Sequence, residues 1–502
     1  MISWRDPLPG NNTLTATDQA TSVAIENNPF LAALAFQNGT YSGGSPDFDI
    51  WSGLDLTFDF RINEADPDAN PVAVWDAALS TAFTLAFADI SAVSGLTFTE
   101  VDDGSADIDI WSYSANDGTL GYSYGVEGSG VFFNESLHST PADGFDEGLS
   151  YGGYDYLTVI HELLHNLGLE HPFEGYANLP GVTNTYDPGD FSLNQVLYTV
   201  MSYSDTNQTD ANGDQTTGWP NTNDAIDQSY SVLGAFDIAF LQTLYGANMA
   251  TATGNTVYEI AAADGDGVYF KSIWDAGGTD EFRYSGSGDV TIDLRAATLD
   301  PGDGMRAGGV LSRADGVHGG YTIAKNTIIE RATGSSGNDT LTGNDADNRL
   351  LGKQGDDTLI GNGGDDNLNG SRGRDVLSGG KQNDTLFGGS GRDRLMGGDQ
   401  ADVILGGSGR DYIVGGKGRD TLTGGKGVDT FVFNKLASFD TITDYLDGTD
   451  RFRIMSGAST FDDLTIGLNA LDNTSVDISF GSVVITVQNA VVGDFDAGDF
   501  LF

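Results

Sequence analysis

In the first third of the chain, hydrophobic residues recur at two spacings, that of a β-strand and that of an α-helix. Leu54, Leu56, Phe58 and Phe60 alternate with polar residues, which predicts a strand with one buried face. Further patterns predict helices at 72–93 and 154–167 and strands at 95–101, 106–111 and 130–134. Strands interleaved with two helices predict an α/β domain, which we place at residues 51–250. The first fifty residues, 1–50, show no sustained period, and we interpret them as a leader or short propeptide.

From residue 334 the pattern becomes a repeat of nine residues. Each of eleven units begins with a glycine: Gly334, Gly343, Gly352, Gly361, Gly370, Gly379, Gly388, Gly397, Gly406, Gly415 and Gly424. Five residues later stands Asp or, once, Asn: Asp339, Asn348, Asp357, Asp366, Asp375, Asp384, Asp393, Asp402, Asp411, Asp420 and Asp429. An apolar residue follows two positions after each of these. This period predicts a solenoid of stacked units over residues 334–433.

The repeated unit, G-G-x-G-x-D-x-U-x with U apolar, resembles the calcium-binding nonapeptide of RTX proteins. Glycine permits the positive-φ positions of a turn, and Asp supplies the hard anionic oxygen that Ca²⁺ prefers. If two units form one coil of a parallel β-roll, residues eighteen apart stack. The predicted calcium ligands then lie along one edge at Asp339, Asp357, Asp375, Asp393, Asp411 and Asp429, and along the other at Asp366, Asp384, Asp402 and Asp420. A flexible glycine-rich linker is the alternative, but it requires neither the fixed Asp nor the fixed apolar residue.

Composition narrows the range of partners. The 502 residues include 73 acidic and 23 basic side chains, a formal net charge of −50 that repels nucleic acid and anionic membranes and favours cations. No cysteine is present, so disulfides cannot stabilise the fold and calcium is the expected substitute. The first residues lack the apolar run of a signal peptide, and polar residues interrupt the segment 72–93, so no membrane span is expected.

The residues from His161 to His171 form the motif H-E-x-x-H-x-x-G-x-x-H. Four-residue spacing places His161 and His165 on one helical face, where both can bind the same Zn²⁺. Gly168 permits the left-handed turn that ends the helix and brings His171 round as a third ligand. Three protein ligands leave one zinc position open for water, and Glu162 is placed to act as its general base. The motif predicts metal-assisted peptide hydrolysis with one catalytic zinc ion.

A second motif lies about thirty residues after His171. The sequence Thr199-Val200-Met201-Ser202-Tyr203 resembles the methionine turn of the metzincins, in which Met201 supports the zinc ligands without touching the metal. The combined motifs resemble the serralysin-type metzincins. That resemblance implies that Tyr203 is a further zinc ligand and swings away to stabilise the transition-state oxyanion. It also implies that the strand at 130–134 is the sheet edge that pairs with an extended substrate peptide.

The resemblance continues between the two predicted domains. Residues 273–280 resemble a calcium loop of the serralysins, which implies calcium ligands at Gly254, Thr256, Asp275, Gly277, Asp280 and Glu330. We therefore expect a β-rich segment with a flanking calcium site at 251–333. The polar stretch 204–229 lacks a complete calcium-loop pattern, and we interpret it as an ordinary loop.

The chain ends with Asp499-Phe500-Leu501-Phe502, which resembles the C-terminal export signal of serralysins. We assign this signal to a C-terminal β segment at 434–502. The resemblance implies type I secretion from a Gram-negative bacterium to the extracellular medium. It implies as partners protein or peptide substrates, the type I secretion machinery and a proteinaceous protease inhibitor. Cytosolic calcium is scarce, so the repeats should remain unfolded until export.

Two alternative functions use the same motifs. The first is a calcium-dependent surface or adhesive RTX protein with an inert zinc site; Glu162 argues against it, because a structural zinc needs no general base. The second is a narrowly specific processing protease, which keeps the chemistry and changes only the substrate. Sequence does not separate a broad protease from a narrow one, because specificity depends on the shape of the pocket.

Overall fold

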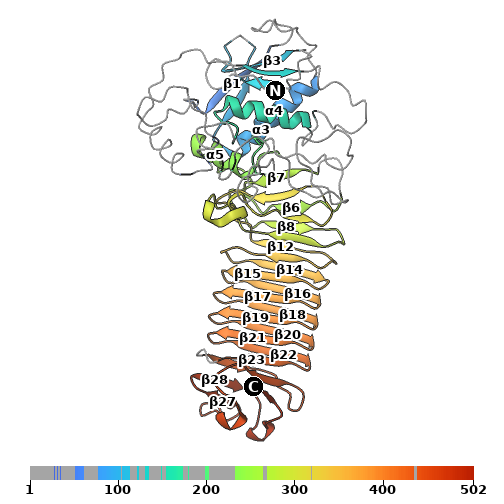
Figure 1. The fold of residues 1–502 in the computed structure, drawn as a ribbon, viewed down its shortest axis with the longest axis vertical. Coiled ribbons are helices and arrows are strands. Elements are labelled where there is room, and N and C mark those ends of the chain that lie inside the picture. Colours follow the sequence, from blue (N-terminus) through green and yellow to red (C-terminus); the bar gives the residue numbers. More distant parts are fainter. Residues whose placement is uncertain are drawn as a thin grey trace.

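The computed structural model is elongated, with an α/β unit at one end and layers of strands stacked below it (Figure 1). It describes residues 51, 53–61, 77–102, 105–113, 121–123, 130–134, 154–172, 198–202, 232–263, 268–317, 319–434 and 438–502, and single residues at 28, 31, 34, 149, 179 and 182. In these parts of the chain, no helix has the length and apolar character needed to cross a membrane.

The α/β unit contains a five-stranded sheet with the order β2-β1-β3-β5-β4. Its elements are β1 (Asp55–Phe60), α3 (Ala77–Val93), β2 (Thr97–Glu100), β3 (Ile108–Tyr113), β4 (Gly121–Ser123), β5 (Gly130–Asn134), α4 (Tyr154–Asn166) and α5 (Ala235–Tyr245). Aromatic side chains join α3 to the sheet: the rings of Phe87 and Phe58 are 4.4 Å apart, and Phe83 meets Phe133 at 6.5 Å. The predicted α/β domain is thus present, with each predicted strand and helix within a few residues of its place.

The strand at 130–134 is not the edge of this sheet. β5 pairs with β3 in parallel and with β4 in antiparallel orientation, so both of its sides are occupied. The expectation of a substrate-pairing edge there is therefore wrong. Among the described strands, β4 is the edge at this end of the sheet and β2 is the edge at the other; the three residues of β4 are too few to produce a recognisable hydrophobic period.

The repeats form a parallel β-roll in which alternate units build opposite sheets. One sheet contains β13 (Thr340–Thr342), β15 (Thr358–Gly363), β17 (Val376–Lys381), β19 (Arg394–Asp399), β21 (Tyr412–Lys417) and β23 (Thr430–Phe433). The other contains β12 (Arg331–Thr333), β14 (Arg349–Gln354), β16 (Asn367–Gly373), β18 (Thr385–Gly391), β20 (Val403–Gly409) and β22 (Thr421–Gly427). Leu341 pairs with Leu359, and Leu350 with Leu368, which is the predicted register of eighteen. These four leucines are fully buried, so the apolar position of the unit builds the core of the roll.

Strands on both sides of the repeats extend the two sheets. Before the repeats lie β6 (Val257–Ile260), β7 (Phe270–Ile273), β8 (Glu281–Tyr284), β9 (Val290–Asp293), the 3-10 helix η2 (Pro301–Gly308), β10 (Arg313–Ala314) and β11 (Gly320–Ile323). Of these strands, β7 and β11 pair with each other in a separate two-stranded sheet. After them lie β24 (Phe439–Ile442), β25 (Arg451–Ile454), η3 (Phe461–Asp463), β26 (Thr465–Leu468), β27 (Val476–Phe480), β28 (Val483–Val487), η4 (Val492–Asp494) and β29 (Phe500–Leu501). Since β8 pairs with β12 and β23 pairs with β25, both sheets run through the predicted boundaries near 334 and 433.

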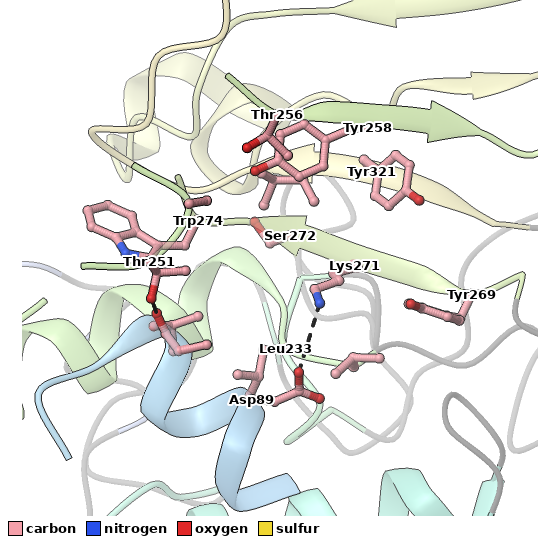
Figure 2. A pocket seen from close by; sticks show the side chains of 15 residues that line it. Asp89, Leu233, Thr251, Thr256, Tyr258, Tyr269, Lys271, Ser272, Trp274 and Tyr321 are labelled. Atoms are coloured by element: carbon pink, nitrogen blue, oxygen red, sulfur yellow. Dashed lines mark hydrogen bonds and ion pairs between the residues drawn. The ribbon is translucent and has the colours of Figure 1, made fainter. Parts of the chain in front are cut away.

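A cavity of about 300 Å³ lies where the α/β unit meets the first layer of the roll (Figure 2). Lys271 of β7 reaches across it to Asp89 of α3, with 3.9 Å between Nζ and Oδ1. The hydroxyl of Tyr156, in the first turn of α4, donates to Asp89 Oδ2 at 2.8 Å. Asp89 therefore connects the first layer of the roll to the helix that carries His161.

Candidate active site

The three motif histidines converge. α4 presents His161 and His165 one turn apart, and Gly168 just after the helix adopts φ +93°, which lets the chain turn back towards α4. The Nε2 atoms of His161 and His165 lie 3.1 and 3.2 Å from His171 Nε2. Two nitrogens on a tetrahedral Zn²⁺ are about 3.3 Å apart, as metal–nitrogen bonds of about 2.0–2.1 Å require. The spacing of these nitrogens therefore fits a zinc ion.

Backbone carbonyls fix the orientation of two of the rings. His161 Nδ1 donates to Val200 O at 2.8 Å, and His165 Nδ1 donates to Leu169 O at 2.7 Å. With the proton on Nδ1, the lone pair of each ring is on Nε2 and faces the other histidines. Burial lowers the pKa of His161 to about 4 and lowers the pKa values of His165 and His171 well below the ordinary range, with repulsion from neighbouring histidines as a further cause for the last two. The rings are thus held neutral, as metal ligands must be.

Glu162 lies beside the histidines in a tight, buried position. Its side chain is 2% exposed, and Oε2 has no hydrogen-bond partner in the described part of the chain. Burial raises the pKa of Glu162 to about 8, which makes the carboxylate a stronger base; a nearby divalent cation would offset part of this rise. Gly121 of β4 covers it closely: a Cβ at this position would lie 3.0 Å from Glu162 Cγ. The edge strand and the predicted base are therefore neighbours.

Met201 is fully buried in the core of the α/β unit, and its backbone N–H donates to Thr199 Oγ1 at 3.1 Å. Asp237 of α5, for which the sequence predicted no role in the site, holds this turn. Its carboxylate accepts hydrogen bonds from Thr199 Oγ1 at 2.6 Å and from the N–H groups of Val200 and Gly234, both at 2.9 Å. Because the carbonyl of Val200 is the acceptor for His161, Asp237 is linked to the histidine cluster through this turn.

The end of α4 is held by two further side chains that the sequence analysis missed. The last carbonyls of a helix have no partner inside it. Trp51 Nε1 donates to Asn166 O at 3.0 Å, and the Tyr245 hydroxyl donates to Leu167 O at 2.9 Å. These bonds fix the turn between α4 and His171. No local signal marks them, because the donors lie 115 and 78 residues from their acceptors.

Some predicted features lie outside the described residues. Tyr203 is one of them, and the loop at 204–229 is another. The segment 1–50 is described only at residues 28, 31 and 34, where Leu31 and Leu34 are buried in the α/β core. The carbonyl of Leu34 accepts a hydrogen bond from the backbone N–H of Glu170 at 2.8 Å, next to His171. At these points the segment packs against the folded unit.

The six residues predicted for the flanking calcium site lie on adjacent loops. Asp280 joins two of them, since Oδ1 accepts from Thr256 N at 2.7 Å and its own N–H donates to Glu330 Oε2 at 2.8 Å. Its other oxygen, Oδ2, is buried without a hydrogen-bond partner among the described groups, and burial raises the pKa of Asp280 to about 6. A buried carboxylate oxygen without a donor fits a cation ligand. Asp275 fits less directly, because Tyr258 and Gly277 already donate to its two oxygens.

A close contact of Gly278 brings the loop that carries Asp280 next to the loop that carries Gly254. Gly278 adopts φ +144°, and a Cβ there would lie 2.4 Å from the carbonyl oxygen of Gly254. That carbonyl also accepts from Thr256 Oγ1 at 3.2 Å. The predicted ligands at Gly254, Thr256 and Asp280 are therefore close neighbours.

The Asp rows of the roll share one hydrogen-bond geometry. In each row, Oδ1 accepts from the backbone N–H of the residue eighteen positions earlier, as in the 2.8 Å bond from Asp339 N to Asp357. Oδ2 is buried with no hydrogen-bond partner in the described structure at Asp357, Asp366, Asp375, Asp384, Asp393, Asp402, Asp411, Asp420 and Asp429. Nine such oxygens in two rows fit bound cations, because burying an unpaired carboxylate oxygen is otherwise costly.

The rows end differently from the prediction. Asp339 has donors on both oxygens, Val290 N on one and Ser335 N on the other, so it fits a calcium ligand less well than the nine. At the far end, Asp440 and Asp450 continue the two rows by accepting from Asp420 N and Asp429 N. Neither residue belongs to the predicted rows, because the spacing widens there from 18 to 20 and 21 residues.

Comparison with known proteins agrees with these features. The family model of the RTX calcium-binding nonapeptide repeat matches residues 328–359, 360–395 and 396–431. Serralysin of Proteus mirabilis is 34% identical over 37% of this chain and 36% of its own length, and Serralysin B of Dickeya chrysanthemi is 31% identical over 49% and 50%. Serralysin of Photorhabdus sp. (strain Az29) is 31% identical over 59% of this chain and 62% of its own length. The matches thus span about a third to three fifths of these relatives. By sequence, the chain is a homologue of the serralysin-type metalloproteases and carries RTX calcium-binding repeats.

Proposed function

We propose that this protein is a secreted, zinc-dependent endopeptidase that hydrolyses extracellular proteins and is stabilised by calcium bound to its β-roll. The observation that carries the proposal is the convergence of three neutral histidine nitrogens beside a buried glutamate. A purely structural zinc site requires four protein ligands and no such base. His161, His165 and His171 would hold the ion.

Bound zinc would supply Lewis-acid activation of a water molecule and of the scissile carbonyl. Glu162 takes the proton that this water loses as it attacks the carbonyl carbon. The same carboxyl then gives the proton to the peptide nitrogen, so that water is added across the bond and the amine leaves neutral. The burial that raises the proton affinity of Glu162 lets it hold the proton between the two steps. We assign to Tyr203 the stabilisation of the oxyanion and a place as further zinc ligand, following the resemblance of the methionine turn.

We propose that the substrate binds as an extended strand along the open side of β4. The edge residues Gly121–Ser123 lie next to Glu162, so a strand paired there would carry its scissile bond past the base. Cleavage should then require several residues on both sides of the bond. Equal rates for dipeptides and for longer peptides would contradict this binding mode.

The C-terminal segment, which we predict to be the export signal, is part of the folded structure. Phe500 is buried in β29 and stacks on Phe452 at 5.0 Å between ring centroids, so the terminal residues form part of the folded roll. We propose that type I secretion machinery of a Gram-negative cell reads this segment before the roll folds. Calcium outside the cell would then complete folding. A proteinaceous inhibitor is a further expected partner of such an enzyme.

The decisive experiment incubates the purified protein, in millimolar calcium, with a heat-denatured protein and with a peptide library. One arm contains 1,10-phenanthroline, which removes zinc and leaves calcium in place, and a second restores zinc afterwards. We expect internal peptide bonds to be cleaved, cleavage to stop with the chelator and to return with zinc. Cleavage that survives zinc removal, or no cleavage by protein with one zinc per chain, would refute the proposal. Cleavage of only a few library peptides would identify a narrowly specific protease.

A further inference from the structure

The structure contains a second cavity, of about 560 Å³, on the outside of the roll near its first coils. It lies between η2, the chain after β9 and the ends of β13, β15 and β17 in three successive coils, where Asn344, Asn362 and Lys381 line it. None of the residues assigned to zinc or calcium by the sequence lines it. Its chemistry is therefore separate from both proposed metal sites.

The charge of this cavity is opposite to that of the molecule. Across the chain, 73 acidic residues outnumber 23 basic ones. The cavity wall instead contains Arg295, Arg306 and Lys381 against one acidic residue, Asp345. In a protein of net charge −50, such a concentration of cations is a local attractor for anions.

Arg306 is the central group. Its Nε is buried and has no hydrogen-bond acceptor among the described residues. Its backbone is fixed, because the carbonyl of Arg306 accepts from the N–H groups of Thr298 and Gly309, both at 3.1 Å. An unpaired, buried guanidinium donor costs free energy, and an oxyanion in the cavity would satisfy it with a charge-assisted hydrogen bond.

The groups around Arg306 can also contribute to the binding of an anion. Asp293 holds the Arg295 guanidinium through Nε and Nη2, which orients this side chain while offsetting its charge. Thr298 Oγ1 accepts from Asp300 N at 3.2 Å and Thr327 Oγ1 accepts from Asp275 N at 3.4 Å, so each hydroxyl still has its proton to donate. Lys381 is exposed and adds a mobile positive charge at the rim.

We propose that this cavity is a binding site for an oxyanion, either a carboxylate group of a small organic acid or an inorganic anion of the sulfate type. Arg306 provides the principal hydrogen bond, and Lys381 provides long-range attraction. The volume is sufficient for a small dicarboxylate. The inference does not depend on protease activity.

Isothermal titration calorimetry of the full, calcium-loaded protein tests the proposal with two probes, sodium succinate and sodium sulfate, at ionic strength held constant with sodium chloride. We expect saturable binding of at least one probe, weakened tenfold or more in Arg306→Gln and a few-fold in Lys381→Gln. Arg349→Gln, which removes an exposed arginine on β14 outside the cavity, should bind as the native protein does. Binding of succinate alone identifies a carboxylate site, and binding of sulfate alone identifies an inorganic one.

Two results would overturn the proposal. One is the absence of saturable binding of either probe to the native protein. The other is equal affinity in the native protein and in Lys381→Gln together with Arg306→Gln, each first shown by circular dichroism to be folded in calcium. Lys381 is exposed, so its replacement leaves the fold intact. Where Arg306→Gln does not fold, native affinity in Lys381→Gln alone overturns the proposal.

Discussion

At the scale of single residues, the candidate site depends on groups whose ordinary properties have been shifted by burial. Glu162 is the clearest example, because nothing in the described chain bonds Oε2 and its pKa is raised to about 8. We expect Glu162→Gln to retain zinc and fold, yet to lower kcat by about a hundredfold to ten-thousandfold, the usual contribution of a general base. Zinc analysis and peptide turnover on the same sample check this. Turnover within tenfold of the native rate would remove Glu162 from its proposed role.

Asp237 allows a second test at this scale. It accepts three hydrogen bonds, so its carboxylate is satisfied in the ionised form even though burial raises its pKa to about 7. Asp237→Asn replaces one acceptor oxygen by a donor and should disturb the methionine turn that holds His161. We expect zinc affinity to fall by about tenfold, in line with other partners of metal ligands.

Competition for zinc with a fluorescent chelator measures the effect of Asp237→Asn. The matched control is Asp303→Asn, the same change at an exposed position of η2. If both variants bind zinc as tightly as the native protein, the link through Val200 has no energetic role.

At the scale of elements, packing at the end of α4 holds the turn that leads to His171. Tyr245→Phe removes the hydroxyl that donates to Leu167 O and leaves that buried carbonyl unpaired, which should cost about 1–3 kcal/mol of stability. Because the same turn leads to His171, zinc affinity should fall as well. Tyr321→Phe is the control, since its hydroxyl also donates to a carbonyl, that of Glu259, far along the chain from α4. A loss of stability with unchanged zinc affinity would show that the turn holds its shape without this bond.

The elements that the sequence predicted are those with a local period. The histidine spacing on α4, the turn at Gly168 and the stacking of Leu341 on Leu359 all follow from residues close in sequence or repeated at a fixed interval. β4 could not be predicted, because three residues carry no period. The bonds of Asp237 to Val200, of Trp51 to Asn166 and of Tyr245 to Leu167 join residues 37 to 115 positions apart, and only tertiary packing brings such partners together. The calcium rows were predicted as far as the spacing stayed constant.

At the scale of the whole molecule, the balance of charge makes folding depend on calcium and on pH together. Burial raises the pKa of Asp375, Asp393 and Asp411 to about 6 and that of Asp366 and Asp402 to about 8. The pKa of an Asp in the unfolded chain is about 3.9. Between these values the folded roll binds protons that the unfolded chain releases, so without calcium the free energy of unfolding must fall as pH rises from about 4 to 8. We expect calcium to reverse this trend, because it would bind the ionised carboxylates and only in the folded state.

We therefore expect far-UV circular dichroism of protein freed of calcium with EGTA at pH 8, and then exchanged into calcium-free buffer, to show more strand at pH 5 than at pH 8. Millimolar calcium should restore the strand signal at pH 8. Light scattering should accompany the measurement at pH 5, because the sequence pI is near 4.1 and a low net charge favours association. The double variant Asp375→Asn with Asp393→Asn is the control. Amides do not titrate, so the loss of two neighbouring carboxylates from one row should make the strand signal depend less on pH. It should also need more calcium to fold at pH 8. A strand signal of the calcium-free protein that is the same at both pH values would mean that the buried carboxylates do not govern the stability of the roll.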